Sequence, residues 1–379
     1  MSIFATTNAT KPLQSLGTAL FALLLLVAST APAQAQMDDG ELPSIDFAVN
    51  LAQHAQYISV DGTDDPIAGF QRVRAGLNAS VQFSENVSGL LMLEQEPNDF
   101  GFQTVTPAVD FVILDLQLNE QLTLRTGTPV TGLMNFRGYS DGPAVQGNPL
   151  IGNSPADMIT AGQGVKLIGS FNSFGFDLTI NKGFGGGLTT SSGGNTGVNL
   201  IGKVRFTGSE LFKFGAGLAT NTGSQTLVFA RGDGDNYDLQ AGTRAVHAQM
   251  PNETIFHADA KVTAGSADLD LWGGYATESE GYSANEDFQA LFGGIGAKVN
   301  FSESFYAAGR FTYAGDQSDA VSNADNTSLS RIQLGIGAHV YDNALFKIEY
   351  VNQSEGGNTQ LSGVGSDWSG VTTELSFNF

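Results

Sequence analysis

The chain has 379 residues, a formal net charge of −21 at pH 7 and no cysteine. This acidic balance excludes nucleic acid as a partner, because nucleic-acid binding requires basic patches. The absence of cysteine excludes disulfides and thiol chemistry. Glycine and phenylalanine are abundant, with 48 and 26 residues. Short segments of period-two alternation, without a sustained helical period, predict an all-β fold.

Residues 1–35 are predicted to be a cleaved secretory signal peptide. Lys11 is the only charged side chain there, an apolar run covers 16–27, and Ala33-Gln34-Ala35 forms an A-x-A cleavage site. The apolar run is too short to cross a bilayer as a helix, and no later window approaches the required length. Residues 36–379 are therefore predicted to form one domain. If it lies in a membrane, it must be a closed barrel.

Sixteen strands are predicted along this domain. Val73, Ala75, Leu77 and Ala79 alternate with polar or small residues, and a tight turn at 84–86 follows. Short turns and long loops then alternate along the chain, as in outer-membrane barrels. The strands are expected at 45–59, 70–83, 87–96, 109–118, 121–128, 163–171, 174–181, 198–207, 211–220, 254–262, 268–277, 288–300, 304–313, 328–340, 344–352 and 369–379.

The segment 221–253 leaves the strand count open. Residues 226–230 and 239–250 could form two further strands, which would give an eighteen-stranded barrel. The polar run 231–236 fits a loop, and sixteen strands keep the alternation of turns and loops intact. The long loops are also where acids gather, including Glu278, Glu280, Glu286 and Asp287 in an expected loop at 278–287; another is expected at 60–69.

The last strand carries a second targeting feature. Val371, Thr373, Leu375, Phe377 and Phe379 fall on one side of an extended strand, with polar residues on the other. This ending resembles the terminal β-signal of Gram-negative outer-membrane proteins. The resemblance implies that Phe377 and Phe379 are read by the outer-membrane assembly machinery. It also implies export and insertion into the cell outer membrane.

The whole plan resembles the sixteen-stranded trimeric porins of Gram-negative bacteria, with a more distant likeness to phosphate-selective porins. Sixteen strands enclose an aqueous channel, and the longest loop, 129–162, follows the fifth strand. In the porins this loop folds into the barrel and narrows it, although the Pro-Glu-Phe-Gly-Gly turn familiar there is missing. An external lid is the alternative. The resemblance implies a homotrimer among lipid and lipopolysaccharide that passes small hydrophilic solutes and needs no cofactor.

Candidate pore-lining residues come from the loop and from the strands. Lys or Arg facing lipid near the midplane costs about 2–4 kcal/mol, so basic residues in strands should face the lumen. The loop candidates are Arg137, Tyr139, Asp141 and Asp157; the wall candidates are Arg72, Arg74, Arg125, Lys166, Lys203, Arg205, Arg310 and Arg331. A basic wall favours anions, whereas acidic loops concentrate cations, so the sign of selectivity stays open.

Two other classes of function remain as alternatives. A substrate-selective channel for anions or oligosaccharides is one; Trp272 and Tyr306 are the plausible aromatic rungs for a saccharide. A barrel used as an adhesin or an enzyme is the other. The four histidines are scattered without a Ser or acid at a motif spacing, and no full calcium-loop pattern is present. The sequence therefore predicts neither an enzyme nor a metal site.

Overall fold

The computed structural model describes residues 43–62, 64–95, 108–130, 133, 135–136, 146–151, 162–182, 198–221, 253–283, 286–317, 328–356 and 367–379. The expected signal peptide and the two extra candidate strands, 226–230 and 239–250, lie outside these residues. Over the described ranges, no helix is long and apolar enough to cross a membrane.

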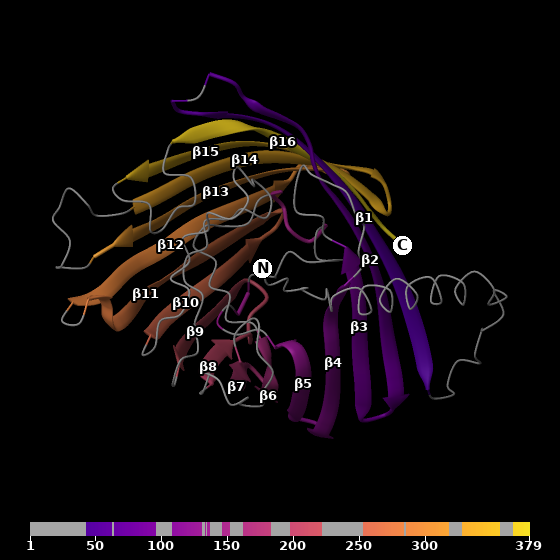
Figure 1. The fold of residues 1–379 in the computed structure, drawn as a ribbon. Helices are drawn as coiled ribbons and strands as arrows, with labels where there is room; N and C mark the ends of the chain where they lie inside the picture. Colours follow the sequence, from indigo (N-terminus) through magenta and orange to yellow (C-terminus); the bar gives the residue numbers. More distant parts are fainter. Residues whose placement is uncertain are drawn as a thin grey trace, which may run out of the picture.

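The described residues form sixteen strands in one closed antiparallel barrel (Figure 1). Each strand pairs with its neighbours in sequence, and β1 pairs with β16. The predicted sixteen-stranded fold is confirmed. The strands are β1 Ser44–Val60, β2 Ile67–Ser84, β3 Val87–Gln95, β4 Ala108–Asn119, β5 Leu122–Val130, β6 Gly162–Phe171, β7 Phe174–Lys182, β8 Asn199–Phe206, β9 Phe212–Asn221, β10 Glu253–Ala264, β11 Ala267–Ser283, β12 Glu286–Asn300, β13 Phe305–Asp316, β14 Ser328–Tyr341, β15 Ala344–Gly356 and β16 Trp368–Asn378.

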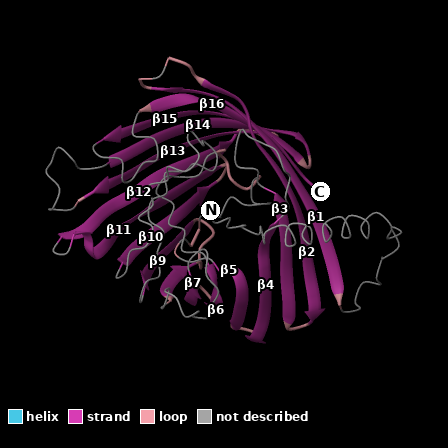
Figure 2. Ribbon diagram, viewed as in Figure 1, coloured by secondary structure: helices cyan, strands magenta, loops and turns pink. Residues whose placement is uncertain are grey.

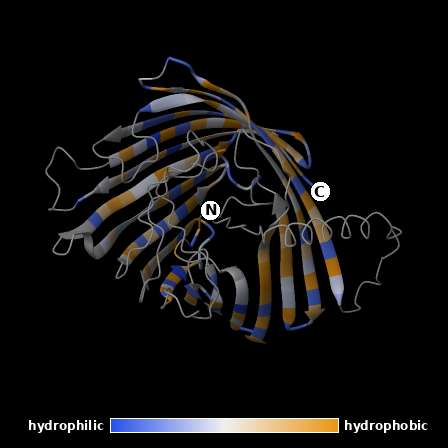
Figure 3. Ribbon diagram, viewed as in Figure 1, coloured by the Kyte–Doolittle hydropathy of each residue, from blue (hydrophilic) through white to orange (hydrophobic). Residues whose placement is uncertain are grey.

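The two faces of the barrel wall have opposite polarity. In β1, Phe47 and Leu51 are exposed, whereas Asn50, His54 and Gln56 are buried. Successive side chains point to opposite faces of a strand, so the apolar set lies outside and the polar set inside. Figure 3 shows hydrophilic and hydrophobic residues interspersed along the strands in the same way. A water-soluble domain would bury the apolar set instead, so the barrel is turned inside out relative to a soluble protein.

The end of the chain closes the barrel. β1 pairs with β16 from Val60↔Trp368 to Asn50↔Asn378. Phe379 continues this seam with two backbone hydrogen bonds to Val49, at 2.9 and 3.0 Å. The rings of Phe377 and Phe379 stack with centroids 6.2 Å apart. The terminal residues therefore belong to the closure itself.

The predicted short turns are found between the strands at one end of the barrel. Ser302 is typical of them: its hydroxyl oxygen accepts hydrogen bonds from the backbone N–H groups of Ser304 and Phe305, each 3.2 Å long. Asn172 adopts a φ of 51°, in the left-handed region that asparagine tolerates better than most residues. Local turn chemistry thus fixes which strands become neighbours.

Several expected loops are shorter than predicted. β11 continues to Ser283 and β12 begins at Glu286, so the loop expected at 278–287 is mostly strand (Figure 2). Backbone pairing persists through Glu278↔Phe288 and, after a register shift, Ser283↔Glu286. The prediction of a loop from the acidic residues was wrong here, because backbone pairing continues through these charged residues. Similarly, β2 begins at Ile67, inside the loop expected at 60–69.

The end of β5 is irregular. Its register with β6 shifts between Gly127 and Val130. Gly127 has a φ of 130°, and a Cβ at this position would collide with the backbone oxygen of Val112. Glycine is therefore required here, because side chains rarely adopt this backbone region and no space exists for one. The irregularity comes directly before the long segment that joins β5 to β6.

Candidate functional site: the inner wall and the inserted segment

Leu133, Asn135 and Phe136 lie against the inner face of the wall around β10. The backbone N–H of Asn135 donates to Asp259 Oδ2 at 2.7 Å, and that of Phe136 donates to the same oxygen at 3.0 Å. The Asn135 side-chain amide donates to Asp259 Oδ1 at 2.8 Å. Leu133 packs in a buried cluster with Ile255 and Phe292, among other inner residues. Asp259 is thus one anchor of the segment between β5 and β6.

Residues 146–151 contact the inner face farther round the barrel. The backbone N–H of Ile151 donates to Glu349 Oε2 at 2.5 Å, and the Tyr306 hydroxyl donates to the carbonyl of Pro149 at 3.1 Å. The Gln146 side-chain amide donates to the carbonyl of Asn343, in the turn between β14 and β15, and to the carbonyl of Ser376 on β16, at 3.1 Å each. Leu150 packs against Tyr306. These contacts confirm the predicted insertion into the barrel and exclude an external lid for these residues.

A chain of polar side chains supports the second anchor. Gln333 donates to Glu349 Oε1 at 2.9 Å, and Arg310 donates to Gln333 at 2.8 Å. Near it, Lys347 and His54 lie 2.8 and 2.5 Å from the Glu374 carboxylate. All of these groups are buried on the inner face. Arg310 and Gln333 link β13 and β14 to β15 and fix the carboxylate that holds Ile151, whereas the contacts of Glu374 link β15, β16 and β1 beside it.

The inner face of β4–β8 carries a different arrangement. The Arg125 guanidinium donates to both oxygens of Asp115, at 2.8 and 2.7 Å. Three cations surround the single carboxylate of Asp177: Arg205 Nη1 at 2.7 Å, Lys203 Nζ at 3.3 Å and Lys166 Nζ at 4.0 Å. Among the side chains described in these contacts, four basic groups therefore face two carboxylates.

The predicted wall residues fall on two arcs. Arg125, Lys166, Lys203 and Arg205 belong to the arc just described, whereas Arg310 and Arg331 lie on β13 and β14, where they donate to Gln333 and Gln353. Arg72 and Arg74 pair in register with His54 and Ala52; their side chains lie outside the described part of the structure, as do the loop candidates Arg137, Tyr139, Asp141 and Asp157. The pore-lining role of all these residues stays a prediction.

Sequence reasoning missed the two anchors. Asp259 and Glu349 were not among the candidate site residues, although both sit on the inner register of their strands. The available signal in the sequence was an acidic residue at a strand position that alternation places on the lumen side. Among the described residues, no group of three or more His, Cys, Asp or Glu side chains could hold a metal ion.

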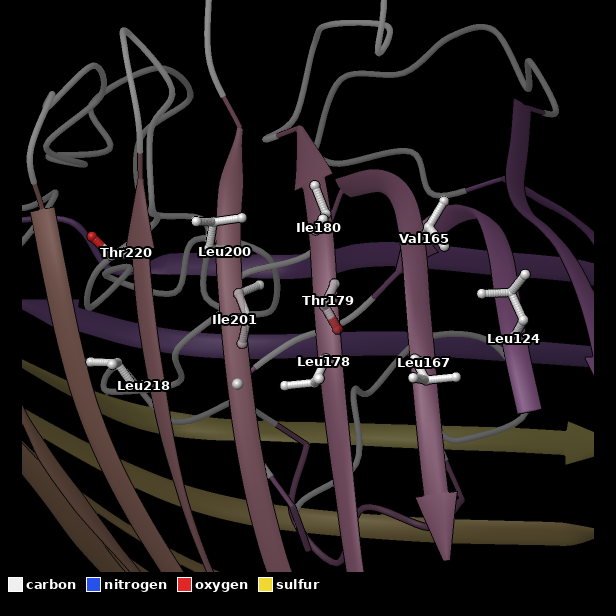
Figure 4. Close-up of a pocket in the computed structure, with 11 residues that line it drawn as sticks. Leu124, Val165, Leu167, Leu178, Thr179, Ile180, Leu200, Ile201, Leu218 and Thr220 are labelled. Carbon is white, nitrogen blue, oxygen red and sulfur yellow. The ribbon is translucent and has the colours of Figure 1, made fainter. Parts of the chain in front are cut away.

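Two depressions mark the wall. One lies on the outer face of β5–β9, where Leu178, Ile180, Leu200 and Leu218 surround Gly202 (Figure 4). Its lining is aliphatic apart from threonine, so it offers no group for chemistry. The other, of about 340 Å³, lies on the inner face of β1–β5 and has both polar and apolar lining residues. The inner depression faces the lumen and is the one that a hydrophilic solute could reach.

No family model and no curated protein matches this chain. Solved structures do. The outer membrane channel DcaP of Acinetobacter baumannii matches with a TM-score of 0.63 and 11% identity, covering 89% of this chain and 97% of that one. OmpT, an outer membrane protein of Vibrio cholerae, matches with a TM-score of 0.60 and 11% identity, covering 91% of this chain and 100% of that one. The anion-selective porin from Comamonas acidovorans matches with a TM-score of 0.57 and 13% identity, covering 89% of this chain and 100% of that one.

The chain has the porin fold. The similarity extends over about nine-tenths of the chain. Because the sequence identities are only 11–13%, it shows a shared fold and nothing more. The porin fold accounts for three features seen above: a closed sixteen-stranded barrel, an apolar exterior with a polar interior, and a segment after β5 that enters the barrel.

Proposed function

We propose that this protein is an outer-membrane porin through which small hydrophilic solutes and ions diffuse passively. The observation that carries the proposal is the segment after β5, held inside a barrel with an apolar exterior and a polar interior by Asp259 and Glu349. A closed barrel of sixteen strands encloses an aqueous channel. The inserted segment narrows it, so solutes are sieved by size.

The exterior supports a position in a membrane. Large apolar side chains such as Phe47, Leu178 and Ile336 are exposed on the outer face. A membrane-spanning strand needs about 9–11 residues, which nearly all of the strands provide. Tyr57 and Tyr341 are 58% and 74% exposed, consistent with an aromatic girdle at the lipid–water boundary. Phe377 and Phe379 serve as the assembly signal, and residues 1–35 as the export signal.

The assembly is proposed to be a homotrimer in contact with lipid and lipopolysaccharide. One of the similar structures, OmpT of Vibrio cholerae, is described in a trimer form. No cofactor is required for diffusion, and we propose no catalysed reaction. In the described residues, the His54 ring bonds to the Glu374 carboxylate within the wall network, which is a structural rather than a catalytic arrangement.

Anion preference is the second candidate, favoured by the β4–β8 arc. Three basic side chains share the Asp177 carboxylate, and Arg125 pairs with Asp115. A wall with surplus positive charge raises the local concentration of anions. The similar porin from Comamonas acidovorans is described as anion-selective. An oligosaccharide channel is less well supported, because Trp272 and Tyr306 are buried and Tyr306 bonds to the inserted segment.

The test is single-channel recording with the purified protein in planar bilayers. Stepwise conductance in KCl is the expected result, and the reversal potential in a KCl gradient gives the sign of selectivity. Complete absence of conductance from folded protein would contradict the porin proposal. A reversal potential that shows preferential passage of potassium over chloride would contradict the anion preference and leave the porin proposal standing.

A further inference from the structure

The inner depression on β1–β5 has an ordered chemical pattern. Two rows of paired residues cross it. One row runs through Gln82, Ser88, Asp115 and Arg125, on β2 to β5. The other runs through Asp46, Ser80, Leu90 and Ile113, on β1 to β4. All eight residues line the cavity of about 340 Å³. An acid therefore stands at one side, a guanidinium at the other, and hydroxyl and aliphatic groups between them.

The charged groups of this depression are accessible. Arg125 and Asp115 retain 33% and 23% of their side-chain exposure, and Asp46 is exposed. The neighbouring pair of Lys166 and Asp177 retains 5% and 8%. Asp115 occupies Nε and one Nη of Arg125, and a guanidinium carries further N–H donors. A solute entering the lumen can therefore contact Arg125 more readily than the Asp177 cluster.

The depression presents both signs of charge. Two carboxylates, Asp46 and Asp115, face one guanidinium, Arg125. A simple anion would be repelled by the acids and a simple cation by the guanidinium. A molecule with an ammonium at one end and a carboxylate at the other satisfies both. Ser80, Ser88 and Gln82 supply hydrogen-bonding groups for its polar middle, and Leu90 and Ile113 supply an apolar floor.

The spacing of the strands sets the length of that molecule. Asp46 is on β1 and Arg125 is on β5, four strand spacings apart, which is about 19 Å along the wall. The Arg125 guanidinium reaches back to Asp115 on β4, which is three strand spacings or about 14 Å from β1, so the distance between the charged groups is shorter than the distance between β1 and β5. An extended peptide spans at most about 3.3–3.6 Å per residue. A peptide of two or three residues therefore fits, whereas a single amino acid is too short to reach both ends.

We propose that this depression binds short zwitterionic peptides, with the ammonium at Asp46 and the carboxylate at Arg125. The proposal rests on the porin function and names one class of solute for it. The site lies near the short turns, at the end of the barrel where Asp46 and the turn at 85–86 are found. A peptide held there briefly is concentrated at that end of the lumen before it leaves.

The test uses triglycine as the probe, added to single channels whose KCl conductance has first been recorded. The expected result is a concentration-dependent fall in ion current. N-acetyl-triglycine, which lacks the ammonium, should have little effect. Asp46→Asn should raise the half-blocking concentration of triglycine roughly tenfold, as expected for loss of one contact with a charged group. Arg125→Gln should act in the same direction.

Asp268→Asn is the matched control, because it removes one inner carboxylate near the same end of the barrel but on β11. It should leave the triglycine block unchanged. Normal conductance with no block by triglycine, or equal block by the acetylated peptide, would overturn the peptide site and leave the porin function intact. An equal shift in Asp46→Asn and Asp268→Asn would also overturn it, since general lumen charge would then be the cause. Asp46 is exposed, so its variant is expected to fold even if Arg125→Gln does not.

Discussion

The two arcs of the inner wall use their carboxylates differently. On β10 and β15, Asp259 and Glu349 accept hydrogen bonds from backbone N–H groups of the inserted segment. On β4 and β7, Asp115 and Asp177 pair with basic side chains instead. The first arc fixes the position of the segment that narrows the barrel. Under the proposed porin function, the second arc sets the electrostatic field that a passing solute would meet. Size selection and charge selection would then depend on separate parts of one wall.

The largest expected effect comes from the end of β5, where the wall leads into the inserted segment. Gly127→Val places a side chain against the backbone of Val112 in a region of φ that valine rarely adopts. The end of β5 can then no longer lead into the inserted segment, so the yield of folded barrel should fall severely. Heat-modifiable migration in gels measures this. Gly202→Ala is the control, because its Cβ would meet Leu178 at an ordinary 3.7 Å. Equal loss in both variants would contradict the special role of Gly127.

The next effect concerns size selection. Asp259→Asn replaces a charged acceptor of three hydrogen bonds by a weaker one. Hydrogen bonds to charged groups are worth about 1.5–3 kcal/mol each, so anchoring should weaken by several kcal/mol at most. Single-channel conductance should rise and become noisier, and larger sugars should enter in liposome swelling. Asp268→Asn, with the same change of charge, should not do this. Unchanged conductance would mean that Glu349 and the apolar contacts hold the segment without Asp259.

A smaller effect is expected for charge selection. Asp177→Asn removes the carboxylate that Lys166, Lys203 and Arg205 share. The reversal potential in a KCl gradient should shift toward anions, with little change in the size limit. Lys203→Gln should shift it the opposite way. Since loss of a buried partner is strongly destabilising, the yield of folded barrel must be recorded for both. Shifts in the same direction would show that structural disturbance, rather than wall charge, governs the potential.

The strands could be predicted because each carries its own signal. A half-apolar wall forces period-two alternation, and Ser, Asn and Gly mark the tight turns. All sixteen predicted strands were confirmed to within three residues at each end, apart from the four-residue extension of β15 and the six-residue extension of β11. The latter failed because Glu278 and Glu280 were interpreted as loop residues, although backbone pairing does not depend on polarity.

The anchors of the inserted segment could not be predicted in the same way. Alternation shows that Asp259 faces the lumen but not what it binds there. Its partner Asn135 is 124 residues away in sequence, and Ile151 is 198 residues from Glu349. Such pairs depend on how the segment lies inside the closed barrel. The insertion itself could be anticipated from the length of the segment and its position after the fifth strand.

The smallest expected effect extends the comparison to β2. Arg72 and Arg74 pair in register with His54 and Ala52, which are buried on the inner face of β1. If both arginines contribute to the field of the lumen, changing them to serine should move the reversal potential toward cations. The shift should be smaller than that of Lys203→Gln, because β2 is several strands from the Asp177 cluster and salt screens charges within about 8–10 Å. A recording in low salt should enlarge it. A potential that does not move at either salt concentration would remove these two residues from the set that lines the narrow part of the channel.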